Sequence, residues 1–128
     1  MGPVAGGKLD GEPTPWPNDW TFTDEFENVL LQTDPEDPYS VTLWGVAVED
    51  QFFIAGQSRD SRWCKKILED ARVVVSVQGQ LYSGLAYEET NPEVLQRVLD
   101  AYITKYDFDI DELDEDDDGI VFQLHRPD

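Results

Sequence analysis

The order of short apolar runs along the chain restricts its fold more than any other feature. Six runs are rich in β-branched and aromatic residues and have the length of strands. Tight-turn residues join two pairs of these runs into hairpins, Glu49-Asp50 in the first and Gln78-Gly79 in the second. The expected strands cover residues 27–33, 39–48, 51–55, 72–77, 81–88 and 120–124. Short strands joined by tight turns are typical of an antiparallel sheet.

Two segments repeat their apolar residues with helical spacing. Residues 60–70 do so through Trp63, Cys64, Ile67 and Leu68. Residues 91–106 begin with a cap and a first-turn proline and continue with a longer apolar stripe. The resulting order, β-β-β-α-β-β-α-β, lacks the strand–helix–strand alternation of a parallel sheet. We therefore predict a mainly β (β+α) fold, a six-stranded and mostly antiparallel barrel with two amphipathic helices packed at its ends.

The length of 128 residues indicates a single domain with a short extension. Residues 1–19 are rich in Gly and Pro and predict a flexible arm, followed by one domain over residues 20–128. Trp16 and Trp20 favour an arm that lies on the barrel or on a partner subunit, with stacking on a ligand as the less favoured alternative. Residues 107–118 hold nine acidic side chains and predict a solvated loop.

That acidic segment also contains part of a calcium-loop pattern. Asp114, Asp116 and Asp118 fit the first, third and fifth ligand positions. The twelfth position is His125, where a bidentate Glu is needed, and a strand is expected there instead of a helix. The pattern therefore argues against an EF-hand and leaves weak cation binding as the alternative to a plain solvated loop.

The net charge of −19 excludes several classes of partner. Nucleic acid and anionic membrane surfaces both require a basic footprint, so we expect neither as a partner. A single cysteine, Cys64, permits no internal disulfide, and one cysteine with one histidine cannot build the usual zinc site. The chain has no apolar run of membrane-spanning length and no signal-peptide core, so we expect a cytoplasmic protein.

The few cations are concentrated at the start of the first expected helix. Five of the nine Lys and Arg residues, Arg59, Arg62, Lys65, Lys66 and Arg72, lie close together. Arg grips phosphate oxygens in pairs, and a helix N-terminus adds backbone N–H groups and a favourable dipole. We therefore predict a phosphate site formed by Ser58, Arg59, Ser61 and Arg62, supported by Lys65 or Lys66. The alternative is that these cations only offset neighbouring acids such as Asp60, Glu69 and Asp70.

The element order and residues 52–77 resemble the FMN-binding split-barrel superfamily, which includes pyridoxamine 5′-phosphate oxidases and deazaflavin-dependent nitroreductase-like proteins. Ser61-Arg62 matches the Ser-Arg of a Ser-Arg-Lys motif that opens a helix in the oxidases. Ala71-Arg72-Val73 is similar to their Pro-Arg-Val strand start. Trp63 replaces the Lys and resembles the Trp of the deazaflavin branch, although Cys64 replaces the Tyr that follows there.

Two further segments resemble the same superfamily, namely residues 82–86 (YSGLA) and 102–106 (YITKY). The resemblance implies a split β-barrel, a homodimer, and FMN or a deazaflavin whose ring lies along residues 39–48. Thr42, Leu43 and Trp44 would then lie beside the ring, although they could equally be barrel packing. Because a flavin itself carries the redox chemistry, no catalytic acid or base is expected from the protein.

Two functions follow from these features. The first is a flavin- or deazaflavin-dependent oxidoreductase that holds a phosphate-bearing small molecule. The second is a split barrel without cofactor that serves as a small binding or interaction module, favoured by the overall negative charge, which repels phosphorylated ligands.

Overall fold

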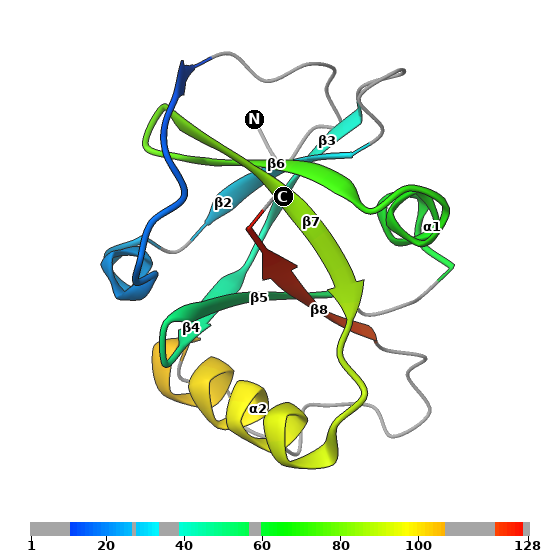
Figure 1. Cartoon of the computed structure of the whole chain (residues 1–128). Coiled ribbons are helices and arrows are strands. Elements are labelled where there is room, and N and C mark those ends of the chain that lie inside the picture. The colour runs from blue at the N-terminus through cyan, green and yellow to red at the C-terminus, as the bar shows by residue number, and fades with distance from the viewer. Residues whose placement is uncertain (1–10, 27, 34–38, 57–59, 107–119, 127–128) are drawn as a thin grey trace.

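The computed structural model describes residues 11–26, 28–33, 39–56, 60–106 and 120–126 (Figure 1). Within these ranges the protein is mainly β, with two α-helices and one short 3-10 helix, η1. The strands are β1 (Glu12–Pro13), β2 (Val29–Thr33), β3 (Tyr39–Leu43), β4 (Gly45–Val48), β5 (Gln51–Gly56), β6 (Arg72–Val77), β7 (Gln80–Glu88) and β8 (Ile120–His125). The helices are η1 (Thr21–Glu25), α1 (Arg62–Glu69) and α2 (Pro92–Tyr106).

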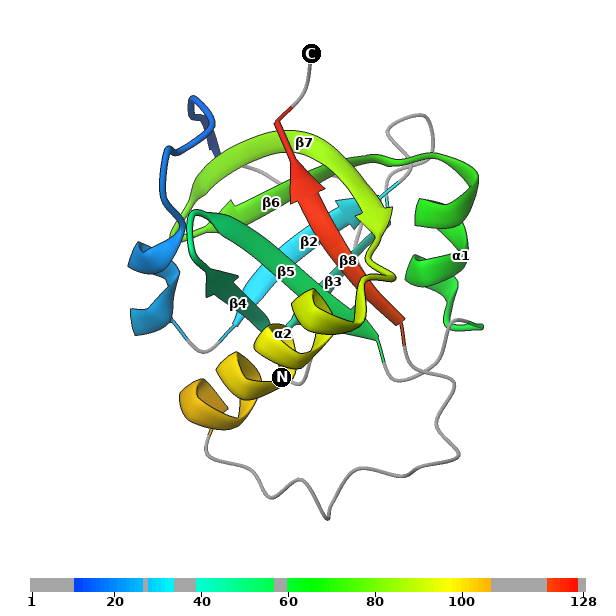
Figure 2. The ribbon, with the colours of Figure 1, turned by 60° about the horizontal axis from the view of Figure 1, so that its bottom comes forward.

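Seven strands follow one another in the sheet in the order β3-β2-β6-β7-β8-β5-β4, and each neighbouring pair is antiparallel. The outer strands β3 and β4 are separated in the chain by Trp44 alone. Because one residue spans only about 7 Å between its two neighbours, the open sheet must curl until its edges meet at Trp44. Figures 1 and 2 show this curled sheet. We call the meeting point, residues 43–45, the seam.

The prediction of one strand over residues 39–48 is wrong, because the strand is interrupted at Trp44: β3 pairs with β2, whereas β4 pairs with β5. Gly45 allows β4 to begin close to the Phe52 side chain of β5. A Cβ at Gly45 would lie 2.2 Å from the Phe52 ring, so only glycine allows β4 to pass this close to β5.

The number of strands and the order of elements in the structure also differ from those predicted. With β3 and β4 separate, and with β1 added by the arm, the described residues hold eight strands where six were expected. The other five expected strands, both helices and both tight turns are confirmed, with ends that move by at most two residues.

One hydrophobic core fills the inside of the curled sheet. Its fully buried side chains include Leu31 of β2, Phe52 of β5, Val75 of β6 and Phe122 of β8. Helix α1 closes one end of the barrel with Trp63, Cys64 and Ile67, the residues whose spacing predicted its apolar face. Cys64 is completely buried, which confirms the expectation that it belongs to the core.

A second, smaller core lies outside the sheet, between α2 and the outer face of β4, β5 and β8. Val46 and Phe53 of the sheet pack there against Val98 and Tyr102 of the helix. Figure 2 shows α2 lying across these strands. Burying side chains of this size stabilises the fold by roughly 1.5–3 kcal/mol each, which is enough to hold α2 on the sheet.

The N-terminal segment is packed against the barrel from residue 11 onward. Strand β1 pairs in parallel with β7, through Glu12 N–H donating to Gly79 O at 3.0 Å and Thr14 N–H donating to Leu81 O at 2.8 Å. Trp20 is completely buried and stacks on Phe52, with ring centroids 4.8 Å apart. In the structure, both Trp16 and Trp20 pack against the core of the barrel.

Some expectations concern segments outside the described residues. They include residues 1–10 of the arm and the acidic segment 107–118 with its calcium-loop pattern. Among the described residues, no helix is long and apolar enough to cross a membrane. The same part of the chain contains no group of three or more side chains able to hold a metal ion.

Candidate functional site

Ser61 lies at the start of α1, as the sequence predicted. It is the N-cap residue, with extended backbone angles, and its carbonyl accepts the first helical hydrogen bond from Lys65 N–H at 3.0 Å. Its side chain makes no capping bond, and its Oγ is buried with no hydrogen-bond partner among the described residues. A buried hydroxyl without a partner is unusual and costs stability unless something bonds it. This position is therefore suited to receive an acceptor from a ligand.

Arg62 follows Ser61 and extends over the first residue of β3. Its guanidinium carbon lies 4.3 Å from the centroid of the Tyr39 ring, the distance of a cation–π contact. The Arg62 side chain remains exposed, as does that of Lys65, whereas Lys66 is half-buried. Tyr39 was not predicted as a site residue, because its contact with Arg62 arises only when β3 and α1 pack together.

Arg72 is firmly engaged within the protein. Its Nη2 lies 2.6 Å from Asp70 Oδ2, and its Nε donates to the same carboxylate at 3.0 and 3.2 Å. Hydrogen bonds from the side chain and the backbone of Arg72 lower the pKa of Asp70 to about 2. Arg72 therefore neutralises a neighbouring acid, Asp70, which is the alternative to phosphate binding that the sequence left open.

Thr42 and Trp44, the predicted ring-side residues, lie at the other end of β3. Thr42 pairs with Leu30 at the edge of the sheet and is half-buried. Trp44 is 44 % exposed and stacks flat on Tyr106 of α2, with centroids 4.2 Å apart and planes 4° apart. At about 3.3 Å per strand residue, Trp44 lies roughly 17 Å along the chain from Tyr39. The sequence did not predict that Tyr106 contacts Trp44. Its only signal for Tyr106 was the resemblance of residues 102–106 to the superfamily.

The structure therefore brings Ser61 and Arg62 together at one end of β3 and places Thr42 and Trp44 at the other. Lys65 and Lys66 lie on the same helix as Arg62, with Lys66 in its last turn. Ser58 and Arg59 lie outside the described residues, and their part in the site stays a prediction.

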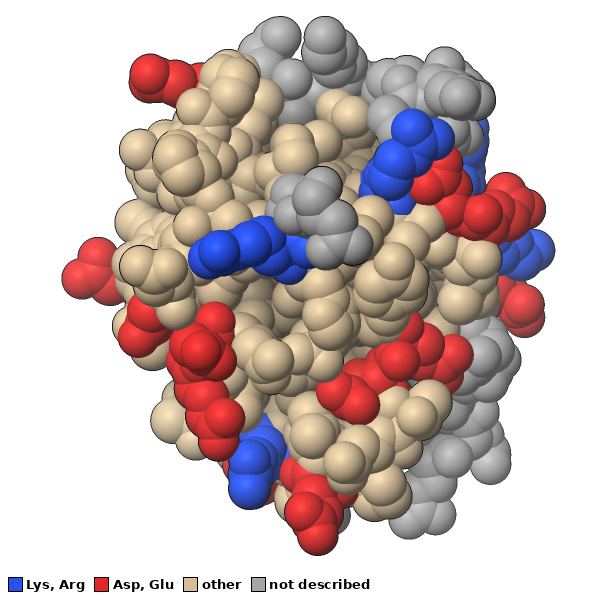
Figure 3. All heavy atoms as spheres, in the orientation of Figure 1, with Lys and Arg blue, Asp and Glu red and all other residues tan. Residues whose placement is uncertain are grey.

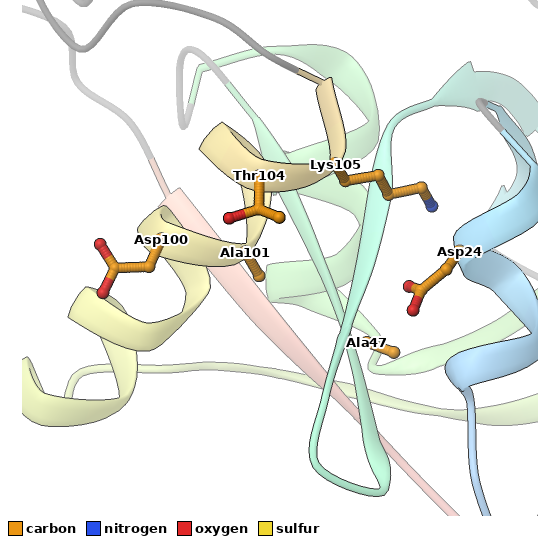
Figure 4. Close-up of a pocket in the computed structure, with 6 residues that line it drawn as sticks. All are labelled: Asp24, Ala47, Asp100, Ala101, Thr104 and Lys105. Carbon is orange, nitrogen blue, oxygen red and sulfur yellow. The ribbon is translucent and has the colours of Figure 1, made fainter.

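A concave region of about 520 Å³ lies between η1, β4 and α2, away from α1 (Figure 4). It is lined by Asp24, Ala47, Asp100, Ala101, Thr104 and Lys105. The Lys105 ammonium donates to Thr23 O at 2.9 Å and to Gly45 O at 2.8 Å. Partial burial lowers the pKa of Lys105, while the nearby Asp24 carboxylate acts in the opposite direction. With its cation bound to backbone carbonyls and two carboxylates on its walls, this region does not suit a phosphate.

The distribution of charge on the surface agrees with this distinction. On the face shown in Figure 3, basic side chains lie at the edge where α1 lies, beside acidic ones. The lower part of the same face, towards α2, carries mostly acidic side chains.

Comparison with proteins of known structure identifies the fold of the chain. No protein-family model and no curated protein sequence matches the chain. Solved structures do match, including HutZ, the heme storage protein from Vibrio cholerae, with 17% identity, a TM-score of 0.68, and coverage of 84% of this chain and 86% of that one. A putative pyridoxamine 5′-phosphate oxidase from Listeria innocua matches with 11% identity, a TM-score of 0.61 and coverage of 82% and 87%.

A FAD-binding protein from Mesorhizobium loti also matches, with 16% identity, a TM-score of 0.55 and coverage of 84% and 87%. At these identities the similarity concerns the fold alone. The chain has the split-barrel fold shared by pyridoxamine 5′-phosphate oxidase-like and flavin-binding proteins.

Proposed function

We propose that this protein binds a flavin, either FMN or a deazaflavin, through its phosphate at the start of α1, and that it acts as an oxidoreductase. One observation carries the proposal: the buried Ser61 Oγ has no partner among the described residues, and Arg62 stands beside it on the first turn of a helix. The fold is one in which flavin-binding proteins occur, which adds support without identifying the ligand.

The residues at this end of the molecule fit a phosphate monoester. The Ser61 hydroxyl donates one hydrogen bond, and the Arg62 guanidinium supplies a planar pair of donors and a full positive charge. The Arg62 guanidinium carbon lies over the Tyr39 ring, and a guanidinium that stacks on a ring still offers its edge N–H groups to an anion. Lys65 and Lys66 add positive charge from the next part of the helix. When bound, the flavin supplies the electron-transfer chemistry, and the protein binds and orients it.

We also propose that the protein acts as a homodimer. Strand β3 is an outer strand of the sheet, so a ligand extended along it is covered on one side only. Leu30, which pairs with Thr42, is 39 % exposed and would be buried by a second copy. Sedimentation equilibrium tests this proposal, and a monomer at tens of micromolar protein would contradict it.

The phosphate site is tested by titrating FMN and following the quenching of its fluorescence. We expect Arg62→Ala to weaken FMN binding about tenfold to a hundredfold, the usual value of a charge-assisted contact, and Ser61→Ala to weaken it several-fold. Arg97→Ala is the matched control, because Arg97 is an exposed cation of α2 that pairs with Glu49. If Arg62→Ala binds FMN as tightly as the parent, the site is wrongly assigned.

The second candidate is a split barrel that binds no cofactor and acts as an interaction module. The pairing of Arg72 with Asp70 and the net charge of −19 favour it, because both reduce the attraction for a phosphate. A ligand that binds only the folded state must raise the melting temperature. A melting temperature unchanged by millimolar FMN and by millimolar reduced deazaflavin would therefore support the module and contradict the flavoprotein.

A further inference from the structure

The concave region between η1, β4 and α2 contains a carboxylate to which no described residue is bonded. Figure 4 shows the Asp24 side chain pointing from η1 into this region, whereas the Asp100 side chain on α2 points away from Asp24. Asp24 forms no hydrogen bond and no ion pair with any described residue. A carboxylate in this position is suited to receive a cation that carries hydrogen-bond donors.

Lys105, the cation among the six lining residues, does not neutralise Asp24 by contact. Its ammonium donates to Thr23 O and to Gly45 O, and it lies 5.2 Å from the centroid of the Tyr106 ring. Burial lowers the pKa of Lys105, and the nearby Asp24 charge opposes that shift. The two groups nevertheless form no ion pair, because the ammonium is held by backbone carbonyls. The Asp24 carboxylate is therefore available to another partner.

The backbone that carries Asp24 is held in place by the protein itself. Thr23 Oγ1 donates to Trp20 O at 2.6 Å, and Phe26 N–H donates to Thr23 O at 2.9 Å. Trp20 is completely buried in the core, so the turn that bears Asp24 is anchored to the barrel. A ligand would meet a preformed wall, which reduces the entropic cost of binding.

The rest of the lining restricts the chemical class of the cation. Ala47 of β4 and Ala101 of α2 contribute methyl groups to the region. No group of three or more described side chains could hold a metal ion, so a metal ion would lose water ligands here without replacement. None of the six lining residues is aromatic, whereas quaternary ammonium groups are recognised by aromatic cages. The volume of about 520 Å³ lies within the roughly 300–1,000 Å³ typical of small-molecule sites.

We infer that this concave region binds a small primary alkylammonium ion, with its ammonium group on Asp24 and its alkyl chain against Ala47 and Ala101. A primary ammonium supplies the N–H donors for a charge-assisted hydrogen bond to a carboxylate, which metal ions and quaternary ammonium groups lack. The net charge of −19 also raises the concentration of cations near the protein. This site lies away from α1 and does not depend on the proposed flavin.

An NMR titration of the ¹⁵N-labelled full chain with n-butylammonium chloride tests the inference. We expect saturable shifts of the backbone amides of Asp24, Ala47 and Ala101, with a Kd of about 1–10 mM, because an exposed carboxylate binds weakly. Methylammonium has a shorter apolar part and should bind severalfold more weakly. Sodium chloride and tetramethylammonium chloride at the same concentrations should give no saturable shifts at these amides.

Two variants separate a contact at Asp24 from the general attraction of an acidic protein for cations. Asp24→Asn and Asp100→Asn each remove one negative charge from the lining, and both side chains are exposed, so both variants should fold. Asp24→Asn is expected to weaken butylammonium binding about threefold to tenfold. Asp100→Asn is the matched control and should weaken it less than twofold, because the Asp100 carboxylate points away from Asp24 and accepts from Gln96 Nε2 at 3.1 Å.

A loss confined to Asp24→Asn, together with weaker binding of methylammonium, supports the alkylammonium site. Equal losses for the two variants, or equal shifts with sodium and with butylammonium, would reveal ionic attraction alone and overturn the inference. Tetramethylammonium binding as tight as that of butylammonium would overturn it as well, because no N–H donor would then be needed. The absence of saturable shifts up to about 100 mM butylammonium, far above the expected Kd, would have the same consequence.

Discussion

The start of α1 and the end of α2 differ in how completely their polar groups are bonded. At the start of α1, the buried Ser61 Oγ has no described partner, and Arg62 is exposed with a ring contact to Tyr39. At the end of α2, the hydroxyls of Tyr102 and Tyr106 and the ammonium of Lys105 all bond backbone atoms at the seam or in η1. Bonded groups hold the fold, whereas groups without partners are available to a ligand. The end of α2 therefore stabilises the fold, whereas the start of α1 is suited to bind a ligand.

The largest expected effect is on stability at the end of α2. Tyr102→Ala removes a side chain that is 8 % exposed together with its hydrogen bond to Trp44 O. We expect it to lower the free energy of unfolding by about 3–5 kcal/mol in urea titrations. The matched truncation on α1, Leu68→Ala, removes a side chain that is 51 % exposed and should cost no more than about 0.5 kcal/mol. Similar losses for the two variants would remove the distinction between the two ends.

The seam itself should tolerate no added side-chain atom. Gly45→Ala places a Cβ against the Phe52 ring, so we expect a loss of about 1–3 kcal/mol in the same unfolding measurement. Gly56→Ala is the corresponding change near α1, where the added atom would meet Cys64 Sγ at 2.6 Å. A neutral result at Gly45 would show that the seam can relax, and would weaken the idea that it is held rigidly.

The two helix starts provide a sharper comparison, because only one of them is capped. Asn91 Oδ1 accepts from Glu93 N–H at 2.9 Å at the start of α2, so Asn91→Ala should cost about 1 kcal/mol. Ser61 makes no such bond at the start of α1, so Ser61→Ala should leave stability nearly unchanged or raise it slightly. Urea unfolding of both variants checks this. A loss at Ser61 equal to that at Asn91 would indicate that Ser61 serves the helix and not a ligand.

The smallest expected effect concerns acid titration at the exposed Asp70–Arg72 pair. Arg72 lowers the pKa of Asp70 from 3.8 to about 2, so the carboxylate is favoured in the folded state. The contribution of this pair to stability is complete above the unfolded pKa and is lost as the pH falls through the folded pKa. Carboxyl NMR should show Asp70 titrating near pH 2, and at a higher pH in Arg72→Gln, where the hydrogen bond from the residue 72 backbone still acts but the guanidinium is gone. Because the pair is exposed, its effect on unfolding should be small.

The sequence predicted most elements because their patterns are local. The spacing of the apolar residues Trp63, Cys64 and Ile67 is enough to predict α1. The pair Asn91-Pro92 predicts the start of α2 to within one residue. Ser61 was identified as a helix-start residue for the same reason. The break at Trp44 was missed because residues 39–48 carry uninterrupted strand composition, and β propensity cannot show which neighbours a strand will have. The count of six strands failed for this reason and because two-residue β1 has no pattern of its own.

What the sequence determined by itself is the set of elements, the position of the cations and the likeness to split-barrel proteins. Tertiary structure alone decided that Arg62 lies over Tyr39 and that Tyr106 stacks on Trp44. Periodicity and capping act within a few residues, so they can be read along the chain. The contacts of Arg62 and Tyr106 join residues that are distant in sequence, and they exist only once the sheet has curled and its edges have met at the seam.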